Sequence, residues 1–286
     1  MELGKQFRYI RQRKGFSIEA VAHDITSVGA ICEFESGRKD MPIGKLQSLL
    51  NRMNVSLSQF ANTSDRLSQE SRDERNEIHS AFMTQDASRL RNLFETPMDA
   101  VAEDAQLIFF DHMLIAGKYY RLTGESLCTQ ADVTRLTDTL LATLTWDDSA
   151  IDVLYWTLPL MNDNRAFMLS REVLSITGNL EAWNVGLYGS AWHVVLEGLV
   201  VLMERRSNFA MTLLRQIETE RPIAEFLIAN RLRFALLKAA LAVQKDDTPE
   251  TREQVQKVIQ QAHALGSREM DDQLRVICER TIGYDF

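Results

Sequence analysis

The chain has 286 residues, of which 45% are hydrophobic and 25% charged, as in an ordinary globular protein of one large or two ordinary domains. Apolar runs such as LIFF and LEGLVVLM are too short to span a bilayer, and the charged N-terminus lacks the apolar core of an export signal. Three cysteines (Cys32, Cys128 and Cys278) are odd in number and far apart, which argues against a disulfide framework. We therefore expect a cytoplasmic protein with no membrane partner.

The net charge of −8 is distributed unevenly along the chain. Residues 1–62 contain nine Lys and Arg against six Asp and Glu, whereas the remainder contains 23 against 34. A small basic head on a large acidic body suits a head that meets a polyanion. Modest local excesses of charge also occur by chance, so the asymmetry alone identifies no partner.

Several short helices are predicted in the first segment. Apolar residues in 3–14 recur at the spacing of an amphipathic helix. Ser17 and Ser27 are suited to cap a second and a third helix, and Gly37 is suited to end the third. Residues 45–60 supply a fourth helix and a short fifth. Short helices joined by tight turns, with basic residues at the edges, are typical of a helix-turn-helix domain.

The rest of the chain is also predicted to be helical. Apolar residues recur at spacings of three and four, and strand-like alternation is scarce. Thr96-Pro97 and Thr248-Pro249 each resemble a Thr N-cap followed by Pro at the first helical position. About ten or more helices in antiparallel pairs are expected. Their predicted breaks lie near Thr96, Gly124, Trp146, Asn162, Asn179, Arg206, Arg221, Asp247 and Gly266.

The predicted fold class is therefore all-α. A five-helix helix-turn-helix domain occupies residues 1–61, a polar Ser-rich linker occupies 62–71, and a large antiparallel helical-repeat, TPR-like domain occupies 72–286. No clean internal repeat is visible, so a large irregular bundle remains the alternative for the last part.

Motifs in the first segment resemble those of a known family. LGK..R.IR..KG.S, FE.G and KL..LL..MNVSL.QF are similar to the head of XRE-type DNA-binding domains, and more narrowly to that of the Rgg/GadR/MutR family of transcriptional regulators. YYRLTGESL and a later Trp resemble the helical C-terminal domain of that family. The resemblance covers nearly the whole chain. It implies a regulator that responds in quorum sensing, since many members sense short secreted peptides that are imported into the cell.

The candidate DNA-binding residues lie on the predicted third helix or flank it. They are Arg8, Arg13, Lys14, Ser27, Val28, Gly29, Ala30, Glu33, Ser36, Arg38 and Lys39. The basic ones are placed to hold phosphates, and a solvated basic rim is the alternative. The resemblance also implies that Arg11 and Glu35 form an internal salt bridge between the first and third helices, and that Phe34 belongs to the core.

The predicted recognition helix lacks the side chains that commonly read bases. The family pattern has Lys, Ser or Gln in the first turn and Gln or Arg one turn later. Here those positions hold Val28, Gly29, Ala30 and Glu33, which form no bidentate pair with guanine or adenine. Val28 is suited to touch a thymine methyl group, and Glu33 to accept from a cytosine amino group. Specificity would then depend on DNA shape and on the spacing of two heads in a homodimer.

The body shows no sign of an enzyme. It contains no phosphate loop, no nucleophile elbow and no HExxH, and its five His are scattered, so we predict no catalytic residue, no metal and no cofactor. A helical body of this kind is suited to bind an extended peptide through Asn and Arg side chains. The candidate effector-binding residues are Asn162, Asn164, Arg165, Asn184, Tyr188, Glu197, Asn230 and Arg233.

Each of these effector-binding candidates has an alternative role as a helix cap or a solvent-facing polar residue. Glu197 stands where the family pattern has Asn. An acidic side chain facing the ligand would favour a basic peptide terminus, or an effector that is not a peptide.

The leading hypothesis is a homodimeric transcriptional regulator. Its head binds double-stranded promoter DNA, and its body binds a short peptide or another small effector. The alternative is a helical-repeat adaptor that binds another protein and whose helix-turn-helix no longer reads DNA.

Overall fold

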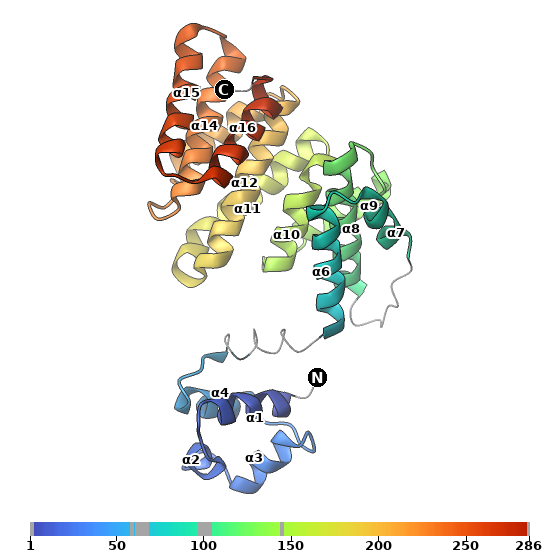
Figure 1. Ribbon diagram of the computed structural model, residues 1–286, viewed down its shortest axis with the longest axis vertical. Helices are drawn as coiled ribbons and strands as arrows, with labels where there is room; N and C mark the ends of the chain where they lie inside the picture. The colour runs from blue at the N-terminus through green and yellow to red at the C-terminus, as the bar shows by residue number, and fades with distance from the viewer. Residues whose placement is uncertain (1–2, 58–59, 61–68, 97–104, 144–145, 285–286) are drawn as a thin grey trace. The chain divides into compact units, whose positions relative to one another are not determined.

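The computed structural model describes residues 3–57, 60, 69–96, 105–143 and 146–284, with 69–74 and 179–183 as backbone only. Every regular element in these residues is helical (Figure 1). The chain divides into two compact units, Met1–Ser80 and Ala81–Phe286. The predicted all-α class is confirmed. Of the predicted linker, 62–68 lie outside the described residues and 69–71 begin a helix, so the predicted boundaries stay predictions.

The helices of the head begin and end where local chemistry predicts. They are α1 (Leu3–Arg13), α2 (Ile18–Ala22), α3 (Val28–Glu35) and α4 (Ile43–Arg52). The Ser17 and Ser27 side chains accept hydrogen bonds from the backbone N–H groups of Ala20 and Ala30 and so cap α2 and α3. Gly37 follows α3 with φ 71°, a left-handed conformation that glycine adopts without a steric penalty. The predicted fifth helix falls on residues 57–60, of which 58–59 lie outside the described residues.

Close packing of α1 on α3 holds the head together. Phe7 and Phe34 are buried with their ring centroids 5.7 Å apart, in a core completed by side chains of α2 and α4. A Cβ on Gly4 would lie 1.6 Å from the Phe34 carbonyl oxygen, so the two helices approach too closely for any side chain there. This close contact fixes the C-terminal end of α3, while its N-terminal end remains outside the core.

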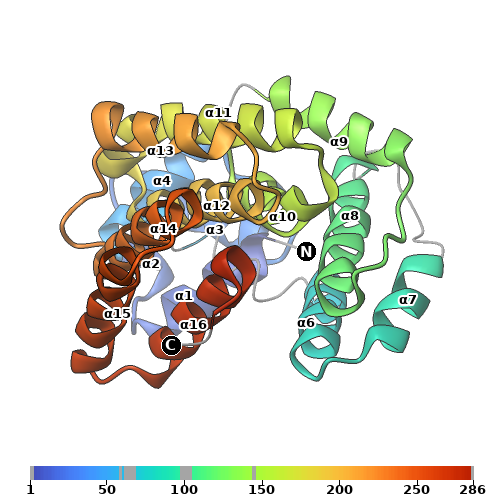
Figure 2. The same cartoon turned by 90° about the horizontal axis from the view of Figure 1, so that it is seen from above.

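The remaining helices follow in chain order. They are α6 (Gln69–Met83), α7 (Ala87–Glu95), α8 (Ala105–Thr123), α9 (Gln130–Leu141), α10 (Asp148–Thr157), the 3₁₀ turn η2 (Leu158–Leu160), α11 (Asp163–Trp183), α12 (Val185–Glu204), α13 (Phe209–Glu220), α14 (Ile228–Lys245), α15 (Pro249–Ala264) and α16 (Arg268–Ile282). Consecutive helices pack in pairs, such as α7 with α8, α11 with α12 and α14 with α15 (Figure 2).

Most predicted breaks coincide with helix ends. Thr248 caps α15 through a capping box with Thr251, and Asp147 caps α10 as the Trp146-Asp147-Asp148 sequence suggests. The break predicted near Asn179 is wrong, because α11 continues to Trp183 and the chain turns at Asn184. Thr96 ends α7, and the helix start predicted at Pro97 lies outside the described residues.

Helix α12 is the central element of the second unit. It packs against α10, α11, α13, α14 and α16, and its residues from Val194 to Met203 are almost all fully buried. Gly198 permits this packing, because a Cβ there would lie 1.9 Å from the Ser170 hydroxyl of α11. By length and composition α12 also passes as a membrane span, but most of it is buried in the core of the unit. The helix therefore sets the positions of the side chains that surround it.

Candidate functional site

Helix α3 of the head exposes a small and apolar surface at its first turn. Val28 is 40% exposed, and nothing lies within 4 Å of the place a Gly29 side chain would occupy. Ala30 and Glu33 are half-buried. The predicted recognition positions are thus accessible at the first turn of α3. They expose the backbone at Gly29 and the branched apolar side chain of Val28.

Polar residues around α3 are paired within the head. Lys39 forms an ion pair with Glu33 at 2.9 Å, and Arg38 donates to the Ser36 hydroxyl at 2.9 Å. Ser36 in turn donates to the Glu33 carbonyl oxygen. All four side chains are at least partly exposed, so these contacts are weak and open to exchange for phosphate contacts.

The other basic candidates differ in what they contact. Arg8 is exposed, and Arg13 is exposed and donates to the Tyr9 hydroxyl at 2.7 Å. Lys14 donates through Nζ to the carbonyl oxygens of Met53 and Asn54, at 3.0 and 3.2 Å. Lys14 thereby ties the end of α1 to the end of α4, which is a structural role.

The predicted salt bridge inside the head is present. Arg11 donates to both carboxylate oxygens of Glu35, at 2.6 and 2.9 Å, and to the Phe16 carbonyl oxygen. Both side chains are buried, and this bidentate pair joins α1 to α3. The pair orients the recognition helix and is not available to DNA.

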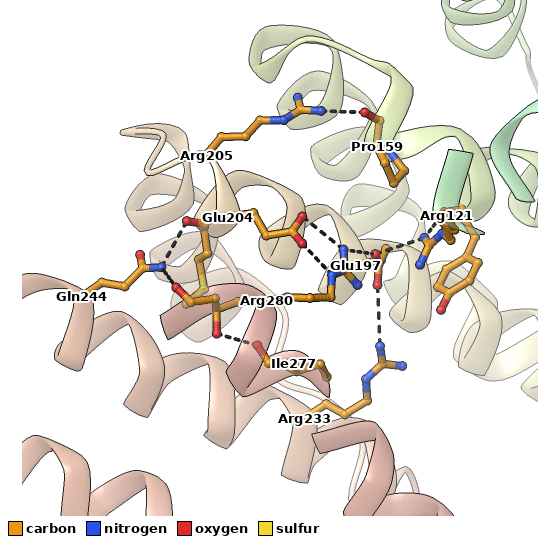
Figure 3. Close-up of polar contacts among 12 residues, drawn as sticks. Arg121, Pro159, Glu197, Glu204, Arg205, Arg233, Gln244, Ile277 and Arg280 are labelled. Atoms are coloured by element: carbon orange, nitrogen blue, oxygen red, sulfur yellow. Dashed lines mark hydrogen bonds and ion pairs between the residues drawn. The ribbon is translucent and has the colours of Figure 1, made fainter. Parts of the chain in front are cut away.

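In the second unit, one buried carboxylate forms ion pairs with three guanidinium groups. Glu197 of α12 is 1% exposed. Its Oε1 lies 3.0 Å from Arg121 Nη2 of α8 and 3.0 Å from Arg280 Nη2 of α16, and its Oε2 lies 3.8 Å from Arg233 Nη2 of α14 (Figure 3). We call these four residues the Glu197 cluster. It joins helices that are as far as 159 positions apart in the sequence, from residue 121 to residue 280.

Further contacts surround the Glu197 cluster. Arg280 also donates to both oxygens of Glu204, at 2.6 and 3.1 Å, and Arg121 donates to the Tyr155 carbonyl oxygen at 2.9 Å (Figure 3). The Arg121 guanidinium lies over the Tyr155 ring, 4.8 Å from its centroid. The cluster is therefore held from α8, α10, α12, α14 and α16 together.

The electrostatics of the cluster keep its carboxylate ionised. Burial by itself would raise the pKa of Glu197, but the positive charges of Arg121, Arg280 and Arg233 outweigh it and lower that pKa below its ordinary value. Glu197 is therefore a fully paired anion. This contradicts the expectation that its charge would be free to attract a basic peptide terminus.

Asn230 and Arg233 are both buried on the same face of α14, as their spacing predicts. The Asn230 amide donates to the Gly189 carbonyl oxygen at 3.4 Å. His193 of α12 lies beside them, and its pKa is lowered by burial, with the charge of Arg233 acting in the same direction. The structure thus brings Glu197, Asn230 and Arg233 to one region between α12 and α14.

The other candidates in this unit have local structural contacts. Asn162 accepts from the Arg165 N–H at the start of α11, and Asn184 caps α12 by accepting from the Leu187 N–H. The Arg165 side chain donates to the Thr134 hydroxyl, and Asn164 is exposed. Tyr188 is buried, and its hydroxyl accepts from the Ala224 N–H at 3.3 Å. Asn162 and Asn184 thus act as helix caps, Asn164 faces solvent, and Arg165 and Tyr188 make interhelical contacts.

Sequence reasoning missed Arg121 and Arg280. Arg121 lies in the YYRLTG motif, so its place in a conspicuous segment was a usable signal. Arg280 lies in an amphipathic helix near the end of the chain, where an Arg among Asp and Glu gives no sign of a distant buried partner.

A buried lysine lies near the Glu197 cluster. Lys118 of α8 is 4% exposed, and its Nζ lies 3.5 Å from the centroid of the Trp156 ring and 4.8 Å from that of Phe82. Burial lowers the pKa of Lys118 from 10.5 to about 8, partly offset by Asp152 and reinforced by Arg121. The aromatic faces partly replace the water that this ammonium loses.

Comparison with known proteins identifies similar folds. No protein-family model and no curated protein matches the sequence. Among solved structures, the chain is similar to the SHP pheromone receptor Rgg2 of Streptococcus dysgalactiae, at 18% identity and a TM-score of 0.73, over 96% of this chain and 98% of that one. It is also similar to PrgX in its complex with cCF10, at 14% identity and a TM-score of 0.65, over 100% of this chain and 94% of that one.

A third solved structure, a bacterial complex of a peptide pheromone and its receptor, has 12% identity and a TM-score of 0.62, over 98% of both chains. Rgg2 and the receptor in that complex are pheromone receptors rather than enzymes. Because the matches cover nearly the full length of each chain, this protein has the two-part, all-α fold of Rgg2 and PrgX, a helix-turn-helix head followed by a helical-repeat body.

Proposed function

We propose that the protein is a cytoplasmic, homodimeric transcriptional regulator that binds double-stranded promoter DNA through its head and a short peptide effector through its body. The observation that carries this proposal is the intact head of a chain that shares its full-length fold with Rgg2 and PrgX. The buried Arg11–Glu35 pair fixes α3, and the first turn of α3 is exposed.

The head binds DNA mainly through contacts with the DNA phosphates. Arg8, Arg38 and Lys39 are exposed around α3, and their contacts with protein groups are weak enough to be exchanged. Val28 and the Gly29 backbone approach base edges, with apolar contact to a thymine methyl group as the available direct readout. The DNA sequence is then selected chiefly by shape and by the spacing of two half-sites.

The body binds the effector near Asn230 and Arg233. Both residues are buried on α14 beside α12, where an amide and a guanidinium can hydrogen-bond a peptide backbone. Effector binding alters DNA affinity to the extent that it favours one arrangement of the dimer over another.

The test is binding of the full chain to duplex DNA from beside its own gene, measured across a salt series. Affinity should fall steeply with salt, and Arg38→Ala should reduce the slope of log K against log salt by about 0.9. Arg231→Ala, an exposed arginine of α14, is the matched control and should leave the slope unchanged. Absence of salt-sensitive affinity for any duplex would refute the regulator function.

One observation favours the alternative of a protein-binding adaptor. The exposed face of α3 offers no long polar side chain to bases, and Glu33 is already paired with Lys39. Recovery of one stoichiometric protein partner by the full chain, together with absent DNA affinity, would establish the adaptor function.

A further inference from the structure

The arginines of the Glu197 cluster outnumber the carboxylates that pair with them. Three guanidinium groups, those of Arg121, Arg233 and Arg280, face two carboxylates, those of Glu197 and Glu204. Nearby, Lys118 and Asp152 offset each other, and the lowered pKa of His193 keeps its imidazole neutral near pH 7. Among the described residues, these three arginines therefore carry one positive charge more than their carboxylate partners balance.

The unbalanced charge can be traced to Arg233. Arg280 donates hydrogen bonds to both Glu197 and Glu204. Arg121 forms an ion pair with Glu197 and donates a hydrogen bond to the Tyr155 carbonyl oxygen. Arg233 approaches Glu197 only to 3.8 Å, which is too long for a hydrogen bond. The Arg233 side chain is only 9% exposed. Nevertheless, no group among the described residues accepts a hydrogen bond from its Nε.

A buried N–H donor without an acceptor is costly, since it has lost its water and gained no hydrogen-bond partner. The Nε of Arg121 is buried without an acceptor as well. Both orphan donors belong to arginines that meet at Glu197 (Figure 3). The site is therefore built for an acceptor that the chain itself does not supply.

We propose that Arg233, assisted by Arg121, binds a carboxylate of the effector. A carboxylate presents two coplanar oxygens that match the guanidinium fork, and its single negative charge balances the single unpaired positive charge. A phosphate dianion would leave a buried excess of negative charge. The carboxylate comes from the C-terminus of a peptide or from an Asp or Glu side chain, and this inference rests on the proposed function of the body as an effector site.

Glu197 positions the arginines for this ligand. Its carboxylate holds Arg121 and Arg280 at 3.0 Å each and leaves Arg233 extended toward it without a hydrogen bond. An effector with a basic group at this place would meet three guanidinium groups and be repelled. The charge preference is thus the opposite of the one expected from Glu197 alone.

The first experiment uses sodium acetate as the probe and the full chain with ¹⁵N-labelled arginine. The Nε–H signals of Arg121 and Arg233 are assigned by their loss in Arg121→Gln and Arg233→Gln. Acetate should shift both signals in a saturable manner, and sodium chloride at equal ionic strength should not. Absence of a saturable shift at Arg233, or an equal shift with chloride, would overturn the carboxylate site.

Variants of α14 control for folding and for general charge. Arg231→Gln removes an exposed arginine two positions away and should leave the acetate response unchanged. Arg233→Lys keeps the charge but loses the fork, so it should weaken the response at Arg121, and Arg233→Gln should abolish it. Circular dichroism and thermal unfolding establish that each variant is folded. If folded Arg233→Gln keeps the full response at Arg121, Arg233 is not the ligand-binding residue.

A second experiment distinguishes the two sources of the carboxylate. Random octapeptides with a free C-terminus, and the same pool as C-terminal amides, are captured on the immobilised full chain and sequenced. Retention of only the free-acid pool assigns the terminus, and retention of amides enriched in Asp or Glu assigns a side chain. Arg233→Gln should lose either kind of retention.

The outcomes separate this inference from the function on which it rests. Peptides retained without regard to carboxylates, and equally by Arg233→Gln, would overturn the carboxylate site while leaving a peptide effector. An acetate response at Arg233 without any peptide retention would support the carboxylate site and count against a peptide effector. DNA binding is measured separately and decides the role of the head.

Discussion

At the residue scale, Glu197 determines how three arginines of different helices are held. Glu197→Gln keeps the volume of the side chain and leaves one buried and two half-buried guanidinium groups without their central anion. We expect the free energy of unfolding to fall by about 3–5 kcal/mol, because breaking a buried ion pair leaves uncompensated charge. Urea denaturation measures this loss. Glu204→Gln, at a more exposed carboxylate, is the control and should lose about 1 kcal/mol or less.

The same residue makes stability depend on acid. Its pKa in the folded chain lies below the ordinary 4.5, despite burial, because of Arg121, Arg280 and Arg233. A carboxyl with a lowered folded pKa stabilises the fold fully above its unfolded pKa, and that stabilisation is lost as pH falls through the folded pKa. The difference in unfolding free energy between wild type and Glu197→Gln should therefore shrink below about pH 4.5. A difference that stays constant down to pH 3 would contradict this assignment.

Lys118 gives the same sign of pH dependence as Glu197, in a higher pH range. Its folded pKa of about 8 lies below the ordinary 10.5, so between these values the unfolded chain binds a proton that the folded chain does not. Wild-type stability should then rise by about 1–3 kcal/mol relative to Lys118→Met as pH increases through that window. Chemical denaturation at several pH values from 7 to 10.5 measures the difference. A parallel pH dependence of the two proteins would show that Lys118 keeps an ordinary pKa.

At the element scale, the packing of α1 on α3 controls the head. A Cβ added at Gly4 would collide with the Phe34 carbonyl oxygen, and the backbone cannot move aside without opening the core. Gly4→Ala should destabilise the head by about 1–3 kcal/mol, the usual cost of overpacking. Gly29→Ala is the matched control, since nothing lies within 4 Å of that position and a helix interior favours Ala. Thermal unfolding should therefore show a loss for the first variant and none for the second.

Helix ends were the elements best predicted from local sequence. Ser17, Ser27 and Thr248 cap helices as expected, because a cap depends on one side chain and a backbone N–H three residues away. The continuation of α11 through Asn179 was missed because it depends on packing against another helix and not on a local side chain. Asn in a helix interior is only slightly unfavourable, and packing of α11 along α12 outweighs it.

At the scale of the whole molecule, the two units have separate cores. The head is built around Phe7, Ile31 and Leu49, and the second unit around α12. Calorimetry of the full chain should therefore resolve two transitions. Gly4→Ala should lower only the transition of the head, and Glu197→Gln only that of the second unit. One transition that both variants lower equally would show that the two cores unfold together.

The candidate sites were predictable to different degrees. The Arg11–Glu35 pair followed from the resemblance, and the exposed first turn of α3 followed from its cap and its periodicity. Arg233 was correctly placed on one face with Asn230, because residues three apart in a helix share a face. The ion pairs of Glu197 were not predicted, since Arg121 and Arg280 come from distant helices that no local pattern connects.

The sequence by itself determined the helical class, the caps, the helix-turn-helix head and the absence of known catalytic motifs, because each depends on residues within a few positions of one another. Only the tertiary structure decided that Glu197 is a paired anion, that Lys14 ties helix ends together and that no described residue accepts a hydrogen bond from Arg233 Nε. The physical reason is that burial and charge balance depend on distances across the fold. Those distances are set by how α8, α12, α14 and α16 pack around a common centre.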